Sequence, residues 1–277
     1  MQTEAAMSAP QKTSGPLSAL HAMLGNLERQ RDAGRINEIV NHPEIYPWVR
    51  GPSNGPLDLS KAIANTDVIA LLGTHGGLLF HRLQPGIFEV HSQVLPEGRG
   101  AWAELCIRAC LHWLFTRTEA VEIVTRCPKG NVAATAMART VGMAREFTNP
   151  RGWINGDQPL AADIYSMTIQ HWMRAAPGLV ERGEWFHRRL EAELARHGVD
   201  ASYAGDQTHD RYAGAAYEML LSGQTDKAVL FYNRVAVMAG YPTIAITERR
   251  PLEIDLGSVT IAMRGDDFWV PDVRPLH

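Results

Sequence analysis

The chain has 277 residues, a length that fits one large domain or two ordinary ones. Its hydrophobic fraction of 45% is that of a globular protein. Its formal net charge of −3 argues against the excess of basic residues that is typical of nucleic-acid-binding proteins. The N-terminal stretch lacks the charged and apolar regions of a signal peptide, and no apolar run reaches the roughly 18 residues that predict a membrane span. We therefore expect a cytoplasmic protein with neither a nucleic-acid nor a membrane partner.

The first third of the chain is predicted to contain short helices followed by three strands. Residues 1–16 are rich in Ser, Pro, Gln and Thr, which predicts a mobile leader. Apolar residues at helical spacing predict a helix from Leu17 to Asp32, and a short helix is expected from Leu57 to Asn65. Alternating runs separated by glycine-containing turns predict an antiparallel meander, with strands at 67–72, 77–83 and 87–94.

The middle of the chain alternates helices and strands. Helical periodicity runs from Arg99 to Phe115, and Val121–Thr125 is a short β-type run. A second helix begins near Asn131 and ends at Gly142, and the apolar segment Ala162–His171 predicts a buried strand. The predicted fold class is therefore α/β (α+β), a mixed, mostly antiparallel sheet flanked by helices.

The last hundred residues are predicted to form a separate unit. An amphipathic helix covers Leu179–His197, and Gly223-Gln224 separates two further helices that form a helical hairpin. Short strands are expected at 243–247, 258–263 and 268–270. The predicted domains are a leader at 1–16, a mixed α/β domain at 17–175, and the helical hairpin with a small β part at 176–277.

Neither the cysteines nor the histidines show the spacing of a metal site. An odd number of thiols in a chain of this kind argues against a disulfide framework, and we expect buried, unpaired side chains at Cys106, Cys110 and Cys127. His209 and Asp210 follow Asp206 closely, but acidic residues at this position are typical of a helix start. We therefore predict no metal ligands.

One run of residues resembles a known family. FEVHSQVLPEGRG contains Val94, Pro96, Arg99 and Gly100 at a strand-turn-helix junction, and Asn131, Ala134, Gly142 and Met143 follow in order. This pattern resembles the GCN5-related N-acetyltransferase (GNAT) superfamily over residues 36–173. The segments INEIVNHP, FEVHSQVLPEGRG and HWLF are similar to GNAT-like proteins of tailed bacteriophages and prophages.

The resemblance implies acetyl-CoA as cofactor and an amine as acyl acceptor. It places the cofactor against five residues of the strand-turn-helix junction and the following helix: Val94, Arg99, Gly100, Ala101 and Asn131. Small residues at the junction allow the backbone to approach a phosphate closely. Asn131 fits a helix N-cap equally well.

The sequence departs from the family pattern at three positions. Trp102 and Glu104 stand where the family has a glycine and a small residue, so they bring bulk and negative charge to the phosphate-binding turn. Ala138 stands where many members have the tyrosine that protonates the departing thiolate. These departures concern the chemistry more than the fold.

The catalytic base is expected on the third strand. Side chains alternate along a strand, so Glu89, His91 and Gln93 share one face. His91 and Glu89 on that face are the candidate catalytic residues, which would position an amine and take its proton. The alternative is that they line a solvated face of the sheet.

Two functions of different classes remain open. The first is an acetyl-CoA-dependent N-acetyltransferase of phage type that acts on an unidentified amine. The second is a catalytically inactive virion or structural protein that uses the fold and the C-terminal part to assemble with virion proteins or with itself. The first places the protein in the host cytoplasm, and the second places it in the virion.

Overall fold

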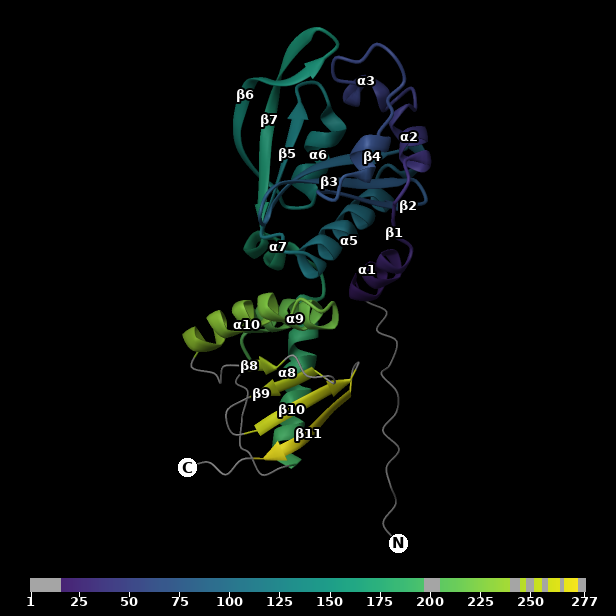
Figure 1. Ribbon diagram of the computed structural model, residues 1–277. Helices are drawn as coiled ribbons and strands as arrows, with labels where there is room; N and C mark the ends of the chain where they lie inside the picture. Colours follow the sequence, from purple (N-terminus) through teal and green to yellow (C-terminus); the bar gives the residue numbers. More distant parts are fainter. Residues whose placement is uncertain are drawn as a thin grey trace.

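The computed structural model describes residues 16–196, residues 205–239 and four strands between 245 and 273. The predicted leader, apart from Pro16, lies outside the described residues. In Figure 1 the chain forms an upper α/β part and a lower part made of helices and a small sheet.

A seven-stranded sheet is the framework of the upper part, in the order β1-β2-β3-β4-β5-β7-β6. All neighbouring strands are antiparallel except β4 and β5, which run parallel. The strands are β1 (Glu28–Arg29), β2 (Val68–Gly73), β3 (Gly76–Gln84), β4 (Ile87–Val94), β5 (Glu122–Pro128), β6 (Ala144–Asn155) and β7 (Gln158–Thr168). The prediction of a mixed, mostly antiparallel sheet and of the meander β2-β3-β4 is confirmed.

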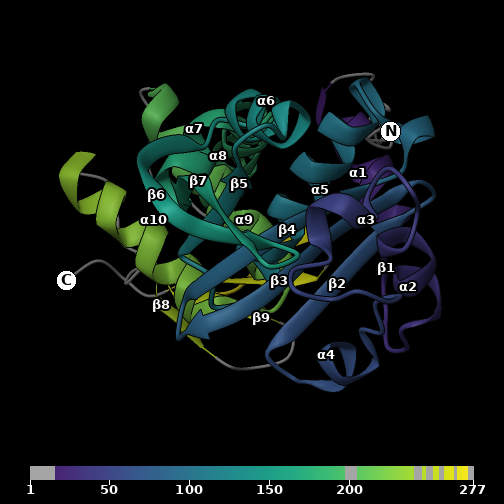
Figure 2. The same ribbon diagram turned by 90° about the horizontal axis from the view of Figure 1, so that it is seen from above.

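Helices cover both faces of the sheet, and the alternation of strand side chains explains why. On β2, Ile69 and Leu71 belong to the larger core beneath α5, while Ala70 and Leu72 belong to a second core with α2 and α4. Figure 2 shows α4 and α5 on opposite sides of these strands. The helices are α1 (Pro16–Gly25), α2 (Gly34–Val40), α3 (Tyr46–Val49), α4 (Ser60–Ala64), α5 (Ala101–Arg117), α6 (Val132–Thr140) and α7 (Ile169–Ala175).

The lower part contains the predicted helical hairpin. The helices are α8 (Leu179–Arg196), α9 (Gln207–Leu221) and α10 (Thr225–Ala239), and Gly223 takes a positive φ of 79° between the last two. A four-stranded antiparallel sheet follows in the order β11-β10-β9-β8, with β8 (Ala245–Thr247), β9 (Leu252–Asp255), β10 (Val259–Arg264) and β11 (Asp267–Val273).

Two close contacts fix the lower helices. Helices α8 and α9 cross where glycines face backbone: a Cβ on Gly214 would lie 2.1 Å from the carbonyl oxygen of Leu179, and one on Gly183 would lie 1.9 Å from that of Asp210. Lys227 on α10 donates from Nζ to three carbonyl oxygens at the end of α5, those of Phe115, Thr118 and Ala120. The Phe115 carbonyl belongs to the last turn of α5, where carbonyls lack intrahelical partners, and the other two follow the end of the helix.

The structure corrects two sequence predictions and shows two strands that were not predicted. The first helix ends at Gly25 rather than Asp32, because residues 28–29 pair with β2. Strand β6 and its hairpin with β7 were not predicted, and residues 169–171 begin helix α7 instead of extending the strand. Strand β9 was also missed.

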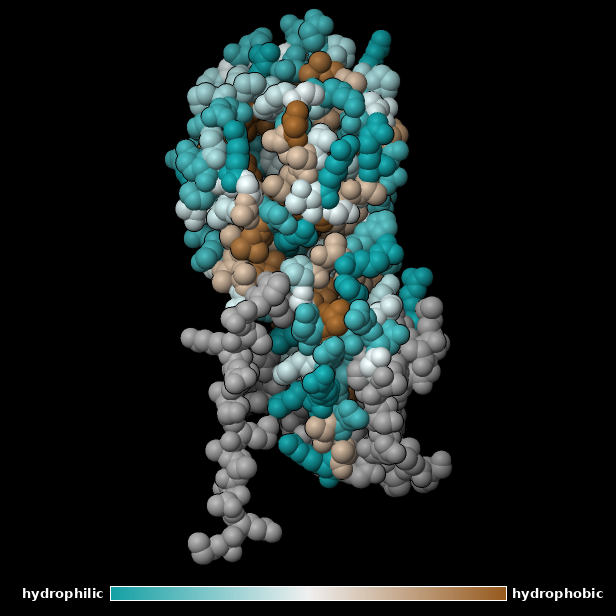
Figure 3. Space-filling view, turned by 180° about the vertical axis from the view of Figure 1, so that it is seen from behind, coloured by the Kyte–Doolittle hydropathy of each residue, from teal (hydrophilic) through white to brown (hydrophobic). Residues whose placement is uncertain are grey.

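The thiols agree with expectation. All three cysteines are buried and unpaired. On the face shown in Figure 3 the surface is mostly hydrophilic, with hydrophobic residues in small separate patches. No helix in the described part of the chain has the length and apolar character needed to span a membrane.

Candidate active site

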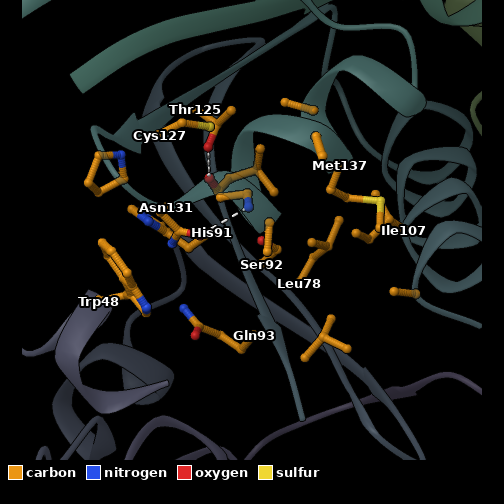
Figure 4. A pocket seen from close by; sticks show the side chains of 18 of the residues that line it. Trp48, Leu78, His91, Ser92, Gln93, Ile107, Thr125, Cys127, Asn131 and Met137 are labelled. Atoms are coloured by element: carbon orange, nitrogen blue, oxygen red, sulfur yellow. Dashed lines mark hydrogen bonds between the residues drawn. The ribbon is translucent and has the colours of Figure 1, made fainter. Parts of the chain in front are cut away.

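A wedge opens where the two parallel strands part. β4 and β5 pair over only three positions, of which the last joins Glu89 and Val124. Beyond this point the strands diverge, and a cavity of about 760 Å³ lies between them. Its walls come from β4, β5, α5, α6 and the segment around Trp48 (Figure 4).

The diverging strand edges face the cavity with their backbones. Residues 90–94 of β4 line it together with Ile123 and residues 125–128 of β5, and each strand uses its other edge for pairing with β3 or β7. Thr125 Oγ1 donates to the carbonyl oxygen of Val90 at 2.8 Å and bridges the narrow end of the wedge (Figure 4). The wider end therefore presents peptide groups that an extended ligand with amide bonds would pair with.

The N-terminus of α5 lies at the edge of the same cavity. Gly100 is the N-cap residue with a φ of 87°, and no side chain caps the helix. A Cβ at Gly100 would have no atom within 4 Å, so the space in front of the helix is open. The first turn of a helix has N–H groups without intrahelical partners and a positive dipole end, which together favour an anion.

The two departures from the family pattern on α5 lie outside the cavity lining. The Trp102 indole packs against His75, with ring centroids 5.1 Å apart, and covers Gly73 and Gly98. Glu104 forms an ion pair with Arg108 at 3.0 Å. The bulk of Trp102 and the charge of Glu104 are thus directed away from the cavity.

The remaining predicted cofactor residues surround the opening. Val94, Arg99, Gly100 and Asn131 line the cavity, whereas Ala101 is exposed in the first turn of α5. Arg99 is held by Glu44, with 2.6 Å between Nη1 and Oε2, and both side chains are about half exposed. An incoming phosphate would compete with this carboxylate for the guanidinium.

Asn131 acts as the N-cap that the sequence allowed. Its Oδ1 accepts a hydrogen bond from the backbone N–H of Ala134 at 3.0 Å. The side chain therefore positions α6, which forms one wall of the cavity.

Glu89 and His91 lie on one face of β4, as predicted, and Arg126 of β5 joins them. The Glu89 carboxylate accepts two hydrogen bonds from Arg126, at 2.6 and 2.8 Å, and lies 3.7 Å from His91 Nε2. Burial opposes ionisation of Glu89, but the bonds from Arg126 and the nearby positive charges hold its pKa below the ordinary value. Glu89 is therefore a fixed anion.

His91 and Arg126 of this cluster both line the cavity, and His91 is the one of the two that can act as a base. Its side chain is 32% exposed, and burial lowers its pKa although the Glu89 carboxylate acts in the opposite direction. In Figure 4, His91 and Gln93 lie toward Trp48 and Asn131, while Ser92 lies on the side of Leu78, Ile107 and Met137. His91 is thus neutral at physiological pH and able to accept a proton.

The cavity lining includes a buried thiol. Ala138 is buried and lines the wall, as does Cys127. Burial, together with the charge of Asp163, raises the pKa of Cys127 to about 11, so the thiol keeps its proton. Asp163 itself is held by Lys129 and Arg145.

Sequence reasoning missed Arg126, Cys127 and the aromatic wall. Trp153, from the unpredicted strand β6, lies 6.4 Å from His91 between ring centroids, and Trp48 approaches Gly130. Arg126 lies on the strand that follows α5 in the sequence. It could be placed beside Glu89 only by knowing that β4 and β5 are parallel neighbours.

Comparisons with known proteins complete the description. No protein-family model and no curated protein matches this sequence. A GNAT-family acetyltransferase from Bacillus anthracis is similar at 14% identity with a TM-score of 0.43, over 52% of this chain and 95% of that chain. A spermidine N-acetyltransferase from Vibrio cholerae, in complex with CoA and spermine, is similar at 13% identity with a TM-score of 0.44, over 54% of this chain and 99% of that chain. A probable acetyltransferase of the GNAT family from Chromobacterium violaceum is similar at 19% identity with a TM-score of 0.43, over 53% of this chain and 83% of that chain.

Proposed function

We propose that this protein binds acetyl-CoA, or a related acyl-CoA, in the wedge and transfers the acyl group to an amine. The observation that carries the proposal is the cavity between β4 and β5, which opens beside the uncapped N-terminus of α5. The resemblance of the sequence to N-acetyltransferases over residues 36–173 supports the same reaction.

The shape of the wedge fits the parts of this cofactor. The pantetheine arm is extended and carries two amide groups, so it would bind to the open edges of β4 and β5 as a short strand does. The pyrophosphate would then lie at the first turn of α5, near Arg99 and Gly100. The open strand edges suit the amide groups of the pantetheine arm, and the N-terminus of α5 suits the negatively charged pyrophosphate.

His91 is the proposed base. A neutral amine attacks the thioester carbonyl, and its proton passes to the imidazole directly or through water while the C–S bond breaks. Glu89, paired with Arg126, would stabilise the imidazolium that forms and would hold it near the amine. The CoA thiolate leaves unprotonated or takes a proton from water.

Calorimetric titration with acetyl-CoA tests the proposal. We expect saturable binding that Ser92→Trp abolishes, because Ser92 lines the cavity and a large ring there would fill the wedge. Leu83→Trp is the matched control, since Leu83 is exposed on β3 and is not part of the lining. Absence of binding at millimolar acetyl-CoA would refute the proposal.

Turnover separates the base from the binding site. With cofactor affinity unchanged, His91→Ala and Glu89→Gln are each expected to slow acyl transfer to a set of model amines. Unchanged rates would remove both residues from the mechanism.

The similarity of INEIVNHP and HWLF to bacteriophage proteins supports a phage or prophage setting, in the host cytoplasm or in the virion. The alternative role there is an inactive scaffold that assembles with virion proteins or with itself. That role predicts a protein that binds no acyl-CoA at all, so the same titration decides between the two.

A further inference from the structure

Three side chains from distant parts of the sequence meet away from the wedge. His21 lies on α1, His112 on α5 and Glu218 on α9. His112 and Glu218 are buried, with side chains 3% and 9% exposed, whereas His21 is 39% exposed at the surface. Helices α1 and α9 thus place polar side chains next to His112 of α5.

The distances between these groups match the edges of a metal coordination tetrahedron. Glu218 Oε2 lies 3.3 Å from His112 Nε2 and 3.6 Å from His21 Nε2, and all three ligand atoms are within 4.8 Å of one another. Zinc binds nitrogen and oxygen ligands at about 2.0–2.1 Å, which gives tetrahedral edges of roughly 3.3 Å. Two of the three edges already have nearly this length.

His112 Nε2 and Glu218 Oε2 form a hydrogen bond at 3.3 Å, but the contacts of both histidines with this carboxylate are long for a charge-assisted bond. A hydrogen bond between a histidine N–H and a carboxylate is usually about 2.7–2.9 Å long. Both histidine contacts to Glu218 are longer than this, and both end on the same oxygen. His112 Nδ1 is buried and has no hydrogen-bond partner in the described part of the chain, so Nε2 is the ring atom directed at a polar group.

The second oxygen of Glu218 is held separately. Arg182 of α8 donates from Nε to Oε1 at 2.9 Å, and its guanidinium lies over the Tyr217 ring. A metal-binding carboxylate is commonly oriented by such an outer partner. The guanidinium also adds positive charge, so we expect weaker binding than at a site with a second carboxylate.

We propose that His21 Nε2, His112 Nε2 and Glu218 Oε2 form a site for a divalent transition-metal ion, with Zn²⁺ the best fit to two imidazoles and one carboxylate. Because the ring of His21 is partly exposed, the site lies at the surface, where water would supply the fourth ligand. The ion ties α1 and α9 to α5, and none of its three ligands lines the wedge, so the inference does not rest on the proposed function.

The test uses the full-length protein after treatment with EDTA and removal of the chelator. Added ZnCl₂ is expected to bind one ion per chain and to raise the melting temperature by roughly 5 °C at 100-fold excess over Kd. Co²⁺ in place of Zn²⁺ is expected to give the intense visible absorption of tetrahedral coordination.

His21→Ala is the decisive variant, because an exposed side chain is removed with little risk to folding. Zn²⁺ binding is expected to weaken at least tenfold, because loss of a residue that only supports a metal ligand already weakens binding by that much. His21→Cys restores a zinc ligand and is expected to recover the binding. His81→Ala, an exposed histidine on β3, serves as control for adventitious surface binding and is expected to bind like the parent. A melting temperature that does not respond to ZnCl₂, or equal binding by His21→Ala, would overturn the proposal.

Discussion

Replacing Glu89 by glutamine tests the electrostatics of the candidate site without knowledge of a substrate. The substitution preserves shape but removes a negative charge 3.7 Å from His91 Nε2. At this distance two unit charges interact by about 1 kcal/mol in water and about 4 kcal/mol at an effective dielectric constant of 20. Arg126 cancels part of this attraction. Because one pKa unit corresponds to about 1.4 kcal/mol, we expect the pKa of His91 to fall by roughly one unit.

The assay is an NMR titration of the histidine ring signals in both proteins. The carboxylate favours the imidazolium, so its loss must lower the pKa, and any acid limb of a rate profile set by His91 must move to lower pH. Arg126→Gln is the opposed control, because removal of a positive charge should raise the same pKa. The His171 signal, from α7, reports on general effects. A pKa of His91 that stays constant or rises in Glu89→Gln would refute this account.

Two further predictions concern stability. Lys227→Met keeps the aliphatic stem but removes the donor to three carbonyls. We therefore expect the free energy of unfolding, measured with denaturant, to fall by about 2 kcal/mol. An unfolding midpoint equal to that of the parent would show that water replaces the ammonium at no cost. Gly214→Ala forces α8 and α9 apart and should cost about 3 kcal/mol, whereas Gly25→Ala, which has open space around its Cβ, should cost little. Equal effects of the two alanines would argue against the close helix crossing.

The elements predicted well from sequence are those whose own residues bury a face. The meander carried alternating apolar residues and glycine turns, and α5 carried a continuous apolar stripe, so local pattern and tertiary structure agreed. Strand β6 lacks such a pattern: most of its residues are exposed, and it contains Pro150 and Gly152. It is a strand because β7 pairs with it, which is information that its own sequence does not contain.

The candidate site shows the same division. The alternation rule placed Glu89 and His91 together because both belong to one strand. Arg126 comes from a strand aligned with β4 only through a helical crossover, and the direction of the Trp102 ring depends on the space left by Gly73 and Gly98. Spacing in sequence identifies such residues, but the fold decides where their side chains go.

The ammonium of Lys227 at the end of α5 has a consequence for how the protein unfolds. The helix at the centre of the upper part depends on α10 for its last carbonyls, and one continuous apolar core extends from Leu20 and Phe115 to Tyr217 and Phe231. Removal of the chain after residue 175 would strip that core and leave α5 with exposed backbone acceptors. The upper part and the hairpin α9–α10 should therefore melt in a single cooperative transition, and the shortened chain should be prone to aggregation rather than behave as an independent module.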